Sequence, residues 1–367
     1  MARVRRPLLL ATATALILTQ AHTPAHAATA GPPTARHTGP VPAAYTPAPA
    51  REEAGIVDLP VSFTVRNVNR SLAACATDGG TYTVRGHLTG PRDLLLGDGD
   101  RAITLYQHDI ASGEWFWRLD AGGYDYTAEL AARGHVSLTV DRLGYGASDR
   151  PHGADVCLGG DADIAHQIVQ QLRDGTYTVP DGEPPAFERV FLAGQGNGAQ
   201  LTQIAGYSFP GIDGLVLMDW TDLGLDPAAN APFLAALPTC LAGADNGYTH
   251  YDATPDDFAE ANFADTEAAI LEQAVPLRNP HPCGDMVSQP GAVLADIRHL
   301  PDVDVPVLLV FGAADDRVGD PEQQRALFTG ADTELVTVPD AGHYPVFSRE
   351  ATVVHDAVAG WLTRHAV

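Results

Sequence analysis

The 367-residue sequence contains no lysine, so arginine supplies all 22 of its basic side chains. The 46 acidic residues outnumber them and give a formal net charge of -24 at pH 7. A surface with so little positive charge repels phosphate backbones and anionic lipid headgroups. The composition therefore makes nucleic acid and anionic membranes poor partners, and a small molecule is the expected one.

Long apolar runs are also missing after the N-terminus, where no stretch reaches the roughly 18 residues of a spanning helix. The N-terminus itself has three early arginines, an apolar segment at 8–18 and the small-x-small site Ala25-His26-Ala27. This pattern is typical of a secretory signal peptide. We expect residues 1–27 to be removed and the mature protein to be secreted; the alternative is an uncleaved N-terminal anchor.

Residues 28–53 are rich in Ala, Pro and Thr and have few apolar side chains at regular spacing. Such composition cannot bury a core, so we expect a flexible linker. The folded domain is then 54–367, and its content of apolar residues is sufficient for a large core. Nothing in the sequence fixes the oligomeric state.

Cysteine is scarce, with four residues in the chain, and neither Cys-x-x-Cys nor His-x-x-x-His occurs after residue 27. The sequence therefore predicts no metal site and no cofactor. An even number of cysteines in an exported protein predicts disulfides, and four cysteines allow three pairings. We favour Cys75 with Cys157 and Cys240 with Cys283, because the second pair closes a loop inside one inserted region.

Strand-like and helix-like segments alternate from residue 61 onward. Alternating patterns at 61–68 and 81–88 predict an antiparallel pair at one edge of a sheet. Short continuous apolar runs predict strands covered on both faces, at 103–106, 136–140, 190–193, 215–218 and 307–311, with a last strand at 335–338. With helical stretches between them, the pattern predicts a doubly wound, mostly parallel α/β sheet.

One segment, about 222–303, interrupts this alternation. It is helix-prone in places and broken by several prolines. We interpret it as an inserted helical lid above the carboxyl edge of the sheet, where such segments exclude water and select substrates.

The five residues 194–198 (Gly-Gln-Gly-Asn-Gly) lack a side chain where chemistry needs one. They follow the apolar run 190–193 and precede a helical stretch, which is the setting of a nucleophile elbow with a reactive residue at its centre. Here the central residue is Gly196. Positive φ is easier for glycine, so the turn survives while the nucleophile is lost.

Taken with four further motifs, these residues make the chain resemble the α/β-hydrolases, in particular secreted bacterial ones. The motifs are 107–109 (Gln-His-Asp), 141–148 (Asp-Arg-Leu-Gly-Tyr-Gly-Ala-Ser), 311–316 (Phe-Gly-Ala-Ala-Asp-Asp) and 340–345 (Asp-Ala-Gly-His-Tyr-Pro). The resemblance implies that His343 is the general base. It implies an orienting acid at Asp315 or Asp316, with Asp219 or Asp222 as substitutes.

The same resemblance places an oxyanion-binding and substrate-binding group at Ile110, Gln195, Gly196 and Asn197. Asp109 stands where the family usually has glycine, and an ionised carboxylate there opposes acyl transfer by repelling the oxyanion. If it is buried, its pKa is expected to rise, so that it donates a proton. The alternatives for Asp109 are a solvated loop acid or a partner of Arg118.

Other residues near these motifs have weaker cases. His108 is expected to be a packed structural residue, and the aromatic residues 115–117 are expected in the core and the pocket wall. A displaced nucleophile at Ser112 is an alternative, but the sequence around Ser112 gives it neither a strained turn nor a neighbouring base.

Three functions follow for a hydrolase-like site without its serine. The first is a non-hydrolytic enzyme, a cyclase, lyase or isomerase, in which His343 and Asp109 move protons on a small apolar metabolite. The second is weak ester or lactone hydrolysis by water that His343 activates. The third is a pseudoenzyme that binds a ligand without turnover. The first is favoured, because two elements of ester chemistry have changed together.

Overall fold

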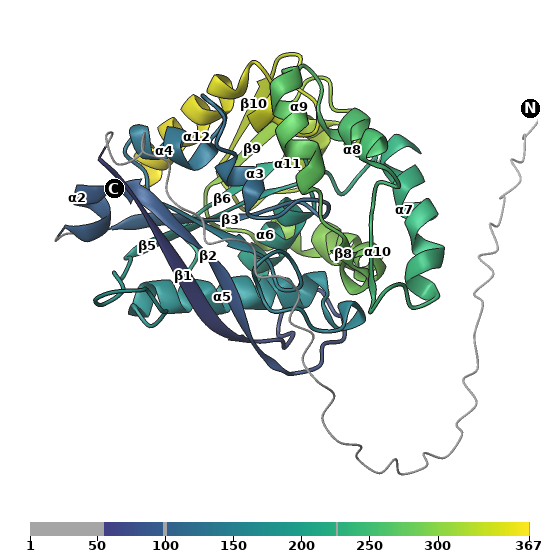
Figure 1. Cartoon of the computed structure of the whole chain (residues 1–367), viewed down its shortest axis with the longest axis horizontal. Coiled ribbons are helices and arrows are strands. Elements are labelled where there is room, and N and C mark those ends of the chain that lie inside the picture. Colours follow the sequence, from purple (N-terminus) through teal and green to yellow (C-terminus); the bar gives the residue numbers. More distant parts are fainter. Residues whose placement is uncertain (1–54, 98–100, 225–226, 367) are drawn as a thin grey trace, which may run out of the picture. The chain divides into compact units, whose positions relative to one another are not determined.

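The computed structural model describes residues 55–97, 101–224 and 227–366. The predicted signal peptide at 1–27 and linker at 28–53 lie outside the described residues. Eight strands form one sheet in the order β1-β2-β4-β3-β5-β6-β9-β10 (Figure 1). They are β1 (Ile56–Arg66), β2 (Thr81–Pro91), β3 (Ala102–Gln107), β4 (Ser137–Asp141), β5 (Arg189–Gln195), β6 (Leu215–Met218), β9 (Val307–Gly312) and β10 (Thr333–Val338).

The sheet is mostly parallel, with one antiparallel edge. Strand β2 runs antiparallel to both β1 and β4, whereas the pairs from β4 to β10 are all parallel. The predicted doubly wound α/β sheet and its antiparallel edge pair are therefore confirmed. The sequence misplaced the first strand, which begins at Ile56 and ends at Arg66 instead of spanning 61–68.

Two apolar layers sandwich the sheet, because alternate residues of each buried strand face opposite sides. In β5, Val190 and Leu192 belong to one apolar cluster, and Phe191 and Ala193 belong to the other. Figure 1 shows α5 (Leu158–Asp174) on one side of the sheet and α4 (Tyr126–Ala132) with α12 (Ala351–His365) on the other. Burial on both faces explains why the parallel strands read as continuous apolar runs.

The remaining helices of this layered body are short, apart from α6. They are α2 (Arg92–Leu96), α3 (Trp115–Arg118), α6 (Asn197–Ser208) and α11 (Pro321–Arg325). Local signals fix several helix ends. Asp125 accepts a hydrogen bond from the backbone N–H of Ala128 at the start of α4, and Gly175 ends α5 in the left-handed conformation.

The chain between β6 and β9 is an insertion of residues 219–306, described except for 225–226. It contains α7 (Pro227–Leu241), β7 (Tyr248–Thr249), α8 (Pro255–Asn262), α9 (Ala268–Ala274), β8 (His281–Pro282) and α10 (Cys283–His299). The disulfide Cys240–Cys283 joins α7 to the start of α10, as the sequence predicted. The insertion thus has helices of its own and an internal cross-link.

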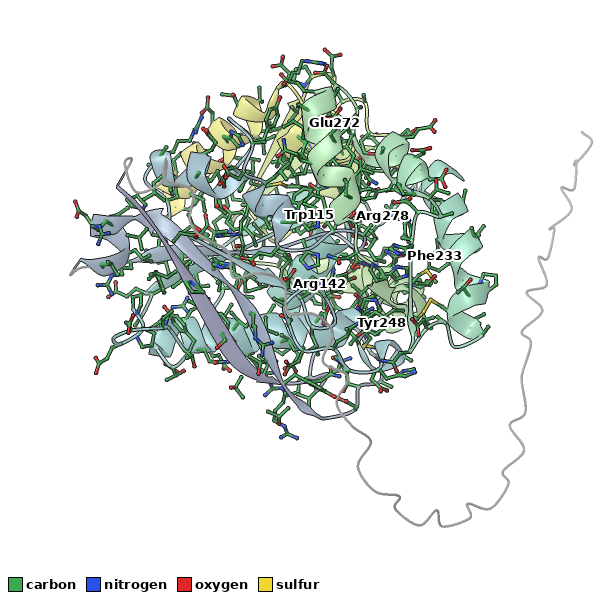
Figure 2. All side chains as sticks on the ribbon, viewed as in Figure 1. Trp115, Arg142, Phe233, Tyr248, Glu272 and Arg278 are labelled. Atoms are coloured by element: carbon green, nitrogen blue, oxygen red, sulfur yellow. A yellow bond between two sulfur atoms is a disulfide. The ribbon has the colours of Figure 1, made fainter. Side chains whose placement is uncertain are left out.

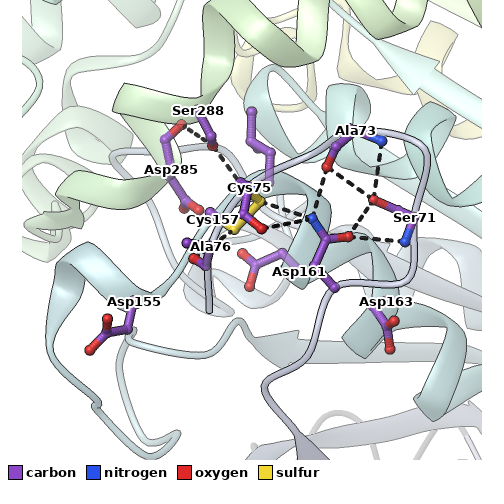
Figure 3. The surroundings of a disulfide bond; sticks show 12 residues. Ser71, Ala73, Cys75, Ala76, Asp155, Cys157, Asp161, Asp163, Asp285 and Ser288 are labelled. Carbon is purple, nitrogen blue, oxygen red and sulfur yellow. Dashed lines mark hydrogen bonds between the residues drawn. A yellow bond between two sulfur atoms is a disulfide. The ribbon is translucent and has the colours of Figure 1, made fainter. Parts of the chain in front are cut away.

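The second disulfide, Cys75–Cys157, also has the predicted pairing. It fixes the loop between β1 and β2 to the start of α5, beside Asp161 (Figure 3). The side-chain amide of Asn69 donates to the carbonyl oxygens of Ala73 and Cys75 in the same loop. The loop is therefore held both covalently and by hydrogen bonds.

No helix among the described residues is long and apolar enough to cross a membrane.

Candidate active site

The turn after β5 has the conformation of a strained strand-to-helix junction. Gly196 has φ 53° and ψ -120°, which L residues other than glycine rarely adopt. Its N–H donates to the carbonyl oxygen of Met218, and α6 begins at the next residue. The strand, turn and helix expected from the Gly-Gln-Gly-Asn-Gly sequence are all present.

The carboxylate of Asp109 occupies the space where a side chain at position 196 would begin. A Cβ atom added to Gly196 would lie 2.4 Å from Oδ1 of Asp109, 2.7 Å from its Cγ and 3.0 Å from Nε2 of His343. Real Cβ atoms essentially never approach another heavy atom closer than 3.0 Å. A serine at 196 and Asp109 in its observed position therefore exclude each other.

Hydrogen bonds fix Asp109 in this place. Oδ1 accepts the backbone N–H of Asn197 at 2.8 Å, and Oδ2 accepts the hydroxyl of Tyr344 at 3.0 Å. Its side chain is 4% exposed, so it is not a solvated loop acid. Nor is it a partner of Arg118, whose guanidinium binds Asp58 at 2.8 Å.

His343 lies between two carboxylates. Its Nδ1 is 2.8 Å from Oδ2 of Asp315, a hydrogen-bond distance. Its Nε2 is 3.6 Å from Oδ2 of Asp109, which is an ion-pair contact longer than a hydrogen bond. The Nε2–H and the Asp109 carboxylate are thus adjacent but do not form a hydrogen bond with each other.

The charge states are the reverse of those expected from the sequence. Burial lowers the pKa of His343, but the charge of Asp315, the close contact with Asp109 and the hydrogen bond to Asp315 outweigh it and raise the pKa to about 10. Burial raises the pKa of Asp109, but the contact with the His343 imidazolium and the N–H groups of Asn197 and Ile110 outweigh it and hold the pKa below its usual range. The expected rise in the pKa of Asp109 is therefore wrong, because both shifts favour the charged forms, a carboxylate at Asp109 and an imidazolium at His343.

Of the four acids considered as partners for His343, the structure places Asp315 against it. Asp316 is exposed on the surface of the same loop, so its assignment is wrong. Asp222 is also wrong, because its carboxylate accepts from Gln203 and Gln324 in a separate buried network. Asp219 is buried beside Asp315, and both its burial and the charge of Asp315 raise its pKa well above the ordinary value.

The predicted oxyanion and substrate-binding residues divide into two groups. Ile110, Gly196 and Asn197 line a cavity at this edge of the sheet. Gln195 lies outside that cavity, and its side-chain amide donates to the backbone oxygen of His343. Gln195 therefore supports the histidine loop instead of contacting a substrate, which corrects its assignment. The N–H of Asn197 faces the site but is already bound by Asp109.

The neighbouring residues of the 108–117 segment have structural contacts. His108 is fully buried, its Nε2 accepts the backbone N–H of Arg142, and burial lowers its pKa to about 3. Ser112 is also buried and donates to the backbone oxygen of Asp109. The packed role predicted for His108 is confirmed, and Ser112 has no position for a nucleophile. Phe116 and Trp117 lie in the core as expected, but none of residues 115–117 lines the cavity.

The cavity has a volume of about 310 Å³ and is walled by both the sheet edge and the insertion. The sheet edge contributes Asp109, Gly196, Asn197 and His343, and the insertion contributes Phe233, Tyr251 and Val293 among others. Figure 2 labels Phe233 on the insertion and Arg142 nearer the middle of the molecule. The loops that carry Asp109, Gly196, Asp219, Asp315 and His343 follow the carboxyl ends of β3, β5, β6, β9 and β10. This is the edge at which open α/β sheets bind ligands.

Three residues with clear roles in this arrangement were missed in the sequence. Tyr344 holds Asp109, as described above. Arg142 donates to Asn197 Oδ1 at 2.9 Å and to Asp285 of α10 at 2.6 Å. Arg317 lines the cavity and binds Asp252 of the insertion at 2.8 Å. Tyr344 and Arg142 lie inside the motifs 340–345 and 141–148. The only sequence signal for a role of Tyr344 was its position directly after His343.

A metal is not supported by the side chains present. No group of three or more His, Cys, Asp or Glu residues in the described part of the chain has an arrangement that could hold a metal ion. Several buried carboxylates instead face arginines or His343, among them Asp285, Asp252 and Asp315.

The chain is similar to proteins of known structure and to one sequence family. Residues 108–357 match the model of the alpha/beta hydrolase family. A thermophilic esterase from Thermogutta terrifontis is 18% identical with a TM-score of 0.57, and the match covers 83% of this chain and 100% of that chain.

Two other solved structures share the fold at similarly low identity. They are an enol-lactonase from Burkholderia xenovorans (15% identity, TM-score 0.55, 79% of this chain and 99% of that chain) and a monoacylglycerol lipase from Paleococcus ferrophilus (20% identity, TM-score 0.53, 72% and 94%). No curated protein matches the chain in sequence. The family match covers more than half of the sequence, and the sheet and site loops agree with it. The chain belongs to the alpha/beta hydrolase family.

Proposed function

We propose that this protein is a non-hydrolytic acid/base enzyme, a cyclase, lyase or isomerase, in which His343 gives a proton and Asp109 accepts one. The observation that supports this most directly is the position of Asp109. Its carboxylate fills the space of the absent nucleophile and binds the N–H of Asn197. A general acid and a general base each contribute about 10² to 10⁴ in rate without a covalent intermediate.

Ester hydrolysis is disfavoured by the same contacts. Stabilising a tetrahedral oxyanion requires backbone donors aimed at it, and here the Asn197 N–H is already bound to a carboxylate. Activation of water requires a neutral imidazole, whereas the pKa of His343 is raised to about 10 by its two acidic neighbours. The charges that suit proton donation by His343 therefore oppose its use as a base.

The cavity supports a small, mostly apolar substrate. Its volume of about 310 Å³ lies at the lower end of the range for small-molecule sites. Trp220, Phe233 and Tyr251 give it aromatic walls, and the insertion that supplies all three is proposed to act as a lid. We also propose that the protein is secreted, which the two disulfides support.

The function is tested by incubating the purified protein with panels of small apolar carbonyl compounds and polyenes, and with ester and lactone panels, followed by mass spectrometry. The expected product is an isomer or a dehydrated form of its substrate, and Asp109→Asn and His343→Gln each abolish its formation. Exposed Asp316 supplies the matched control, because Asp316→Asn is expected to retain full turnover.

Two outcomes contradict the proposal. Hydrolysis of an ester that survives Asp109→Asn but is lost in His343→Gln makes the protein a hydrolase. Ligand-dependent thermal stabilisation without turnover, unchanged by His343→Gln, makes it a binding protein.

A further inference from the structure

Resting on the proposed function, we infer that the substrate is a neutral carbonyl compound with a hydrogen on its α-carbon, and that the reaction proceeds through its enol. The inference comes from the spacing of the two polar atoms, from the coupling between their charges and from the pairing of every cation that lines the cavity.

The spacing suits a donor and an acceptor site one carbon apart. Nε2 of His343 and Oδ2 of Asp109 are 3.6 Å apart, and both residues line the cavity. In a fragment O=C–C–H, standard bond lengths place the oxygen and the α-carbon about 2.4 Å apart. Such a fragment can approach both groups from the same side, with its oxygen at His343 and its α-carbon at Asp109.

The same spacing opposes displacement by Asp109 at a saturated carbon. In that reaction the nucleophile approaches opposite to the leaving group, so the acid that protonates the leaving group must lie on the far side of the carbon. The proton donor here is instead adjacent to the carboxylate. Proton exchange on neighbouring substrate atoms is the chemistry that this geometry supports.

The charges of the two groups depend on each other. Burial alone raises the pKa of Asp109, and the His343 imidazolium is the main influence that lowers it. When His343 gives its proton to the substrate oxygen, that influence disappears and Asp109 becomes a stronger base. The α-carbon is thus deprotonated as the carbonyl oxygen is protonated, and no net charge accumulates in the buried site.

The atoms of this step balance. The N–H bond at Nε2 breaks and an O–H bond forms on the substrate oxygen, while the α C–H bond breaks and an O–H bond forms on Asp109. The electron pair of the C–H bond becomes the C=C bond of the enol, and the C=O bond becomes C–O. In the reverse step a proton moves from Asp109 to carbon and the enol O–H proton moves to Nε2 of His343, which regenerates the carbonyl compound and the ion pair.

The pairing of the lining cations indicates that the substrate is neutral. His343 faces Asp109 and Asp315, and Arg317 binds Asp252. Among the described residues that line the cavity, these two are the cations, and neither lacks a carboxylate partner. A substrate carboxylate or phosphate would therefore enter a site with no unpaired positive charge.

The inference is tested by hydrogen–deuterium exchange at the α-carbon of ethyl 2-methylacetoacetate, followed by proton NMR in D₂O. The purified protein is expected to accelerate exchange over buffer, and Asp109→Asn and His343→Gln are each expected to reduce the acceleration by about 10²-fold or more. Asp316→Asn is the matched control and retains the wild-type rate. Ethyl isobutyrate has an α-hydrogen beside only one carbonyl group, which makes that hydrogen far less acidic, and is expected to show no detectable exchange.

A second measurement separates this inference from the proposed function. The ionisation of His343 is followed by ¹⁵N NMR between pH 6 and 11 in the wild-type protein. If His343 is charged at pH 7 but the wild-type protein exchanges the α-hydrogen no faster than Asp109→Asn, the enol inference is overturned. The proposed acid/base function is not contradicted by that result. A neutral His343 at pH 7 overturns the proposed function as well.

Discussion

A serine placed at position 196 is expected to fail as a nucleophile unless Asp109 is removed with it. The new Cβ would lie 2.4 Å from Oδ1 of Asp109, which is held by the N–H of Asn197 and the hydroxyl of Tyr344. Overpacking of a buried site costs about 1–3 kcal/mol, and a non-glycine residue at φ 53° adds about 1–3 kcal/mol. Gly196→Ser alone is therefore expected to destabilise the fold by several kcal/mol without giving an esterase.

The double variant Asp109→Gly with Gly196→Ser removes the clash and frees the N–H of Asn197. One such donor is worth about 10² to 10³ in kcat for acyl transfer. We expect hydrolysis of p-nitrophenyl acetate by the double variant to exceed that of Gly196→Ser by at least about 10²-fold. We also expect the two substitutions to be non-additive in free energy of unfolding by about 0.5–3 kcal/mol.

Urea denaturation and ester assays on the wild type, both single variants and the double variant measure these quantities. Asp109→Gly alone has no nucleophile and is the control for removal of the carboxylate. Adding His343→Ala to the double variant is expected to abolish the new activity. Equal esterase activity in Gly196→Ser and in the double variant, or additive stabilities, would refute the steric argument.

Three further predictions concern stability. The raised pKa of His343 contributes to the free energy of unfolding, and this contribution is complete below pH 6.5, the ordinary pKa of histidine. It is lost as the pH rises toward about 10, at up to about 1.4 kcal/mol per pH unit. Urea denaturation across pH 6.5–10 is therefore expected to show a smaller decrease in the free energy of unfolding for His343→Gln than for the wild type. Arg142→Met leaves buried Asp161 and Asp285 without their cation and is expected to lower the free energy of unfolding by about 3–5 kcal/mol. The control Arg85→Met breaks an exposed ion pair and is expected to lower it by about 0–1 kcal/mol. Equal losses by urea denaturation would contradict the burial argument. Replacing Cys240 and Cys283 by serine opens a loop with a sequence separation of 43, and chain entropy predicts that the free energy of unfolding falls by about 4 kcal/mol. An unchanged unfolding midpoint would show that the disulfide does not stabilise the fold.

The fold was predictable because its signals are local and repeated. Most of the parallel strands are short apolar runs, and some of the helices between them have a local start or stop residue, such as Asp125 for α4 and Gly175 for α5. The register of β1 was less predictable, since residues 56–60 alternate poorly and their pairing with β2 depends on contacts distant in sequence.

The site was predictable as a set of loops but not as a set of charges. Motif spacing placed His343 and Asp109 in one site, yet it left Asp315 and Asp316 undecided, because neighbouring residues on a turn point in different directions. The pKa of Asp109 depends on its distance from His343 in space, and sequence spacing does not give that distance. Burial alone predicted a rise, whereas burial beside an imidazolium gives a fall.

The mutual exclusion of a side chain at 196 and the carboxylate at 109 imposes an order on mutational history. If the chain descends from a hydrolase with serine at 196 and glycine at 109, an aspartate arriving first would meet the serine side chain. The contact therefore favours loss of the serine first, through an ancestor with neither nucleophile nor carboxylate. Among relatives, serine at 196 together with aspartate at 109 should be absent, whereas glycine at both positions marks the intermediate.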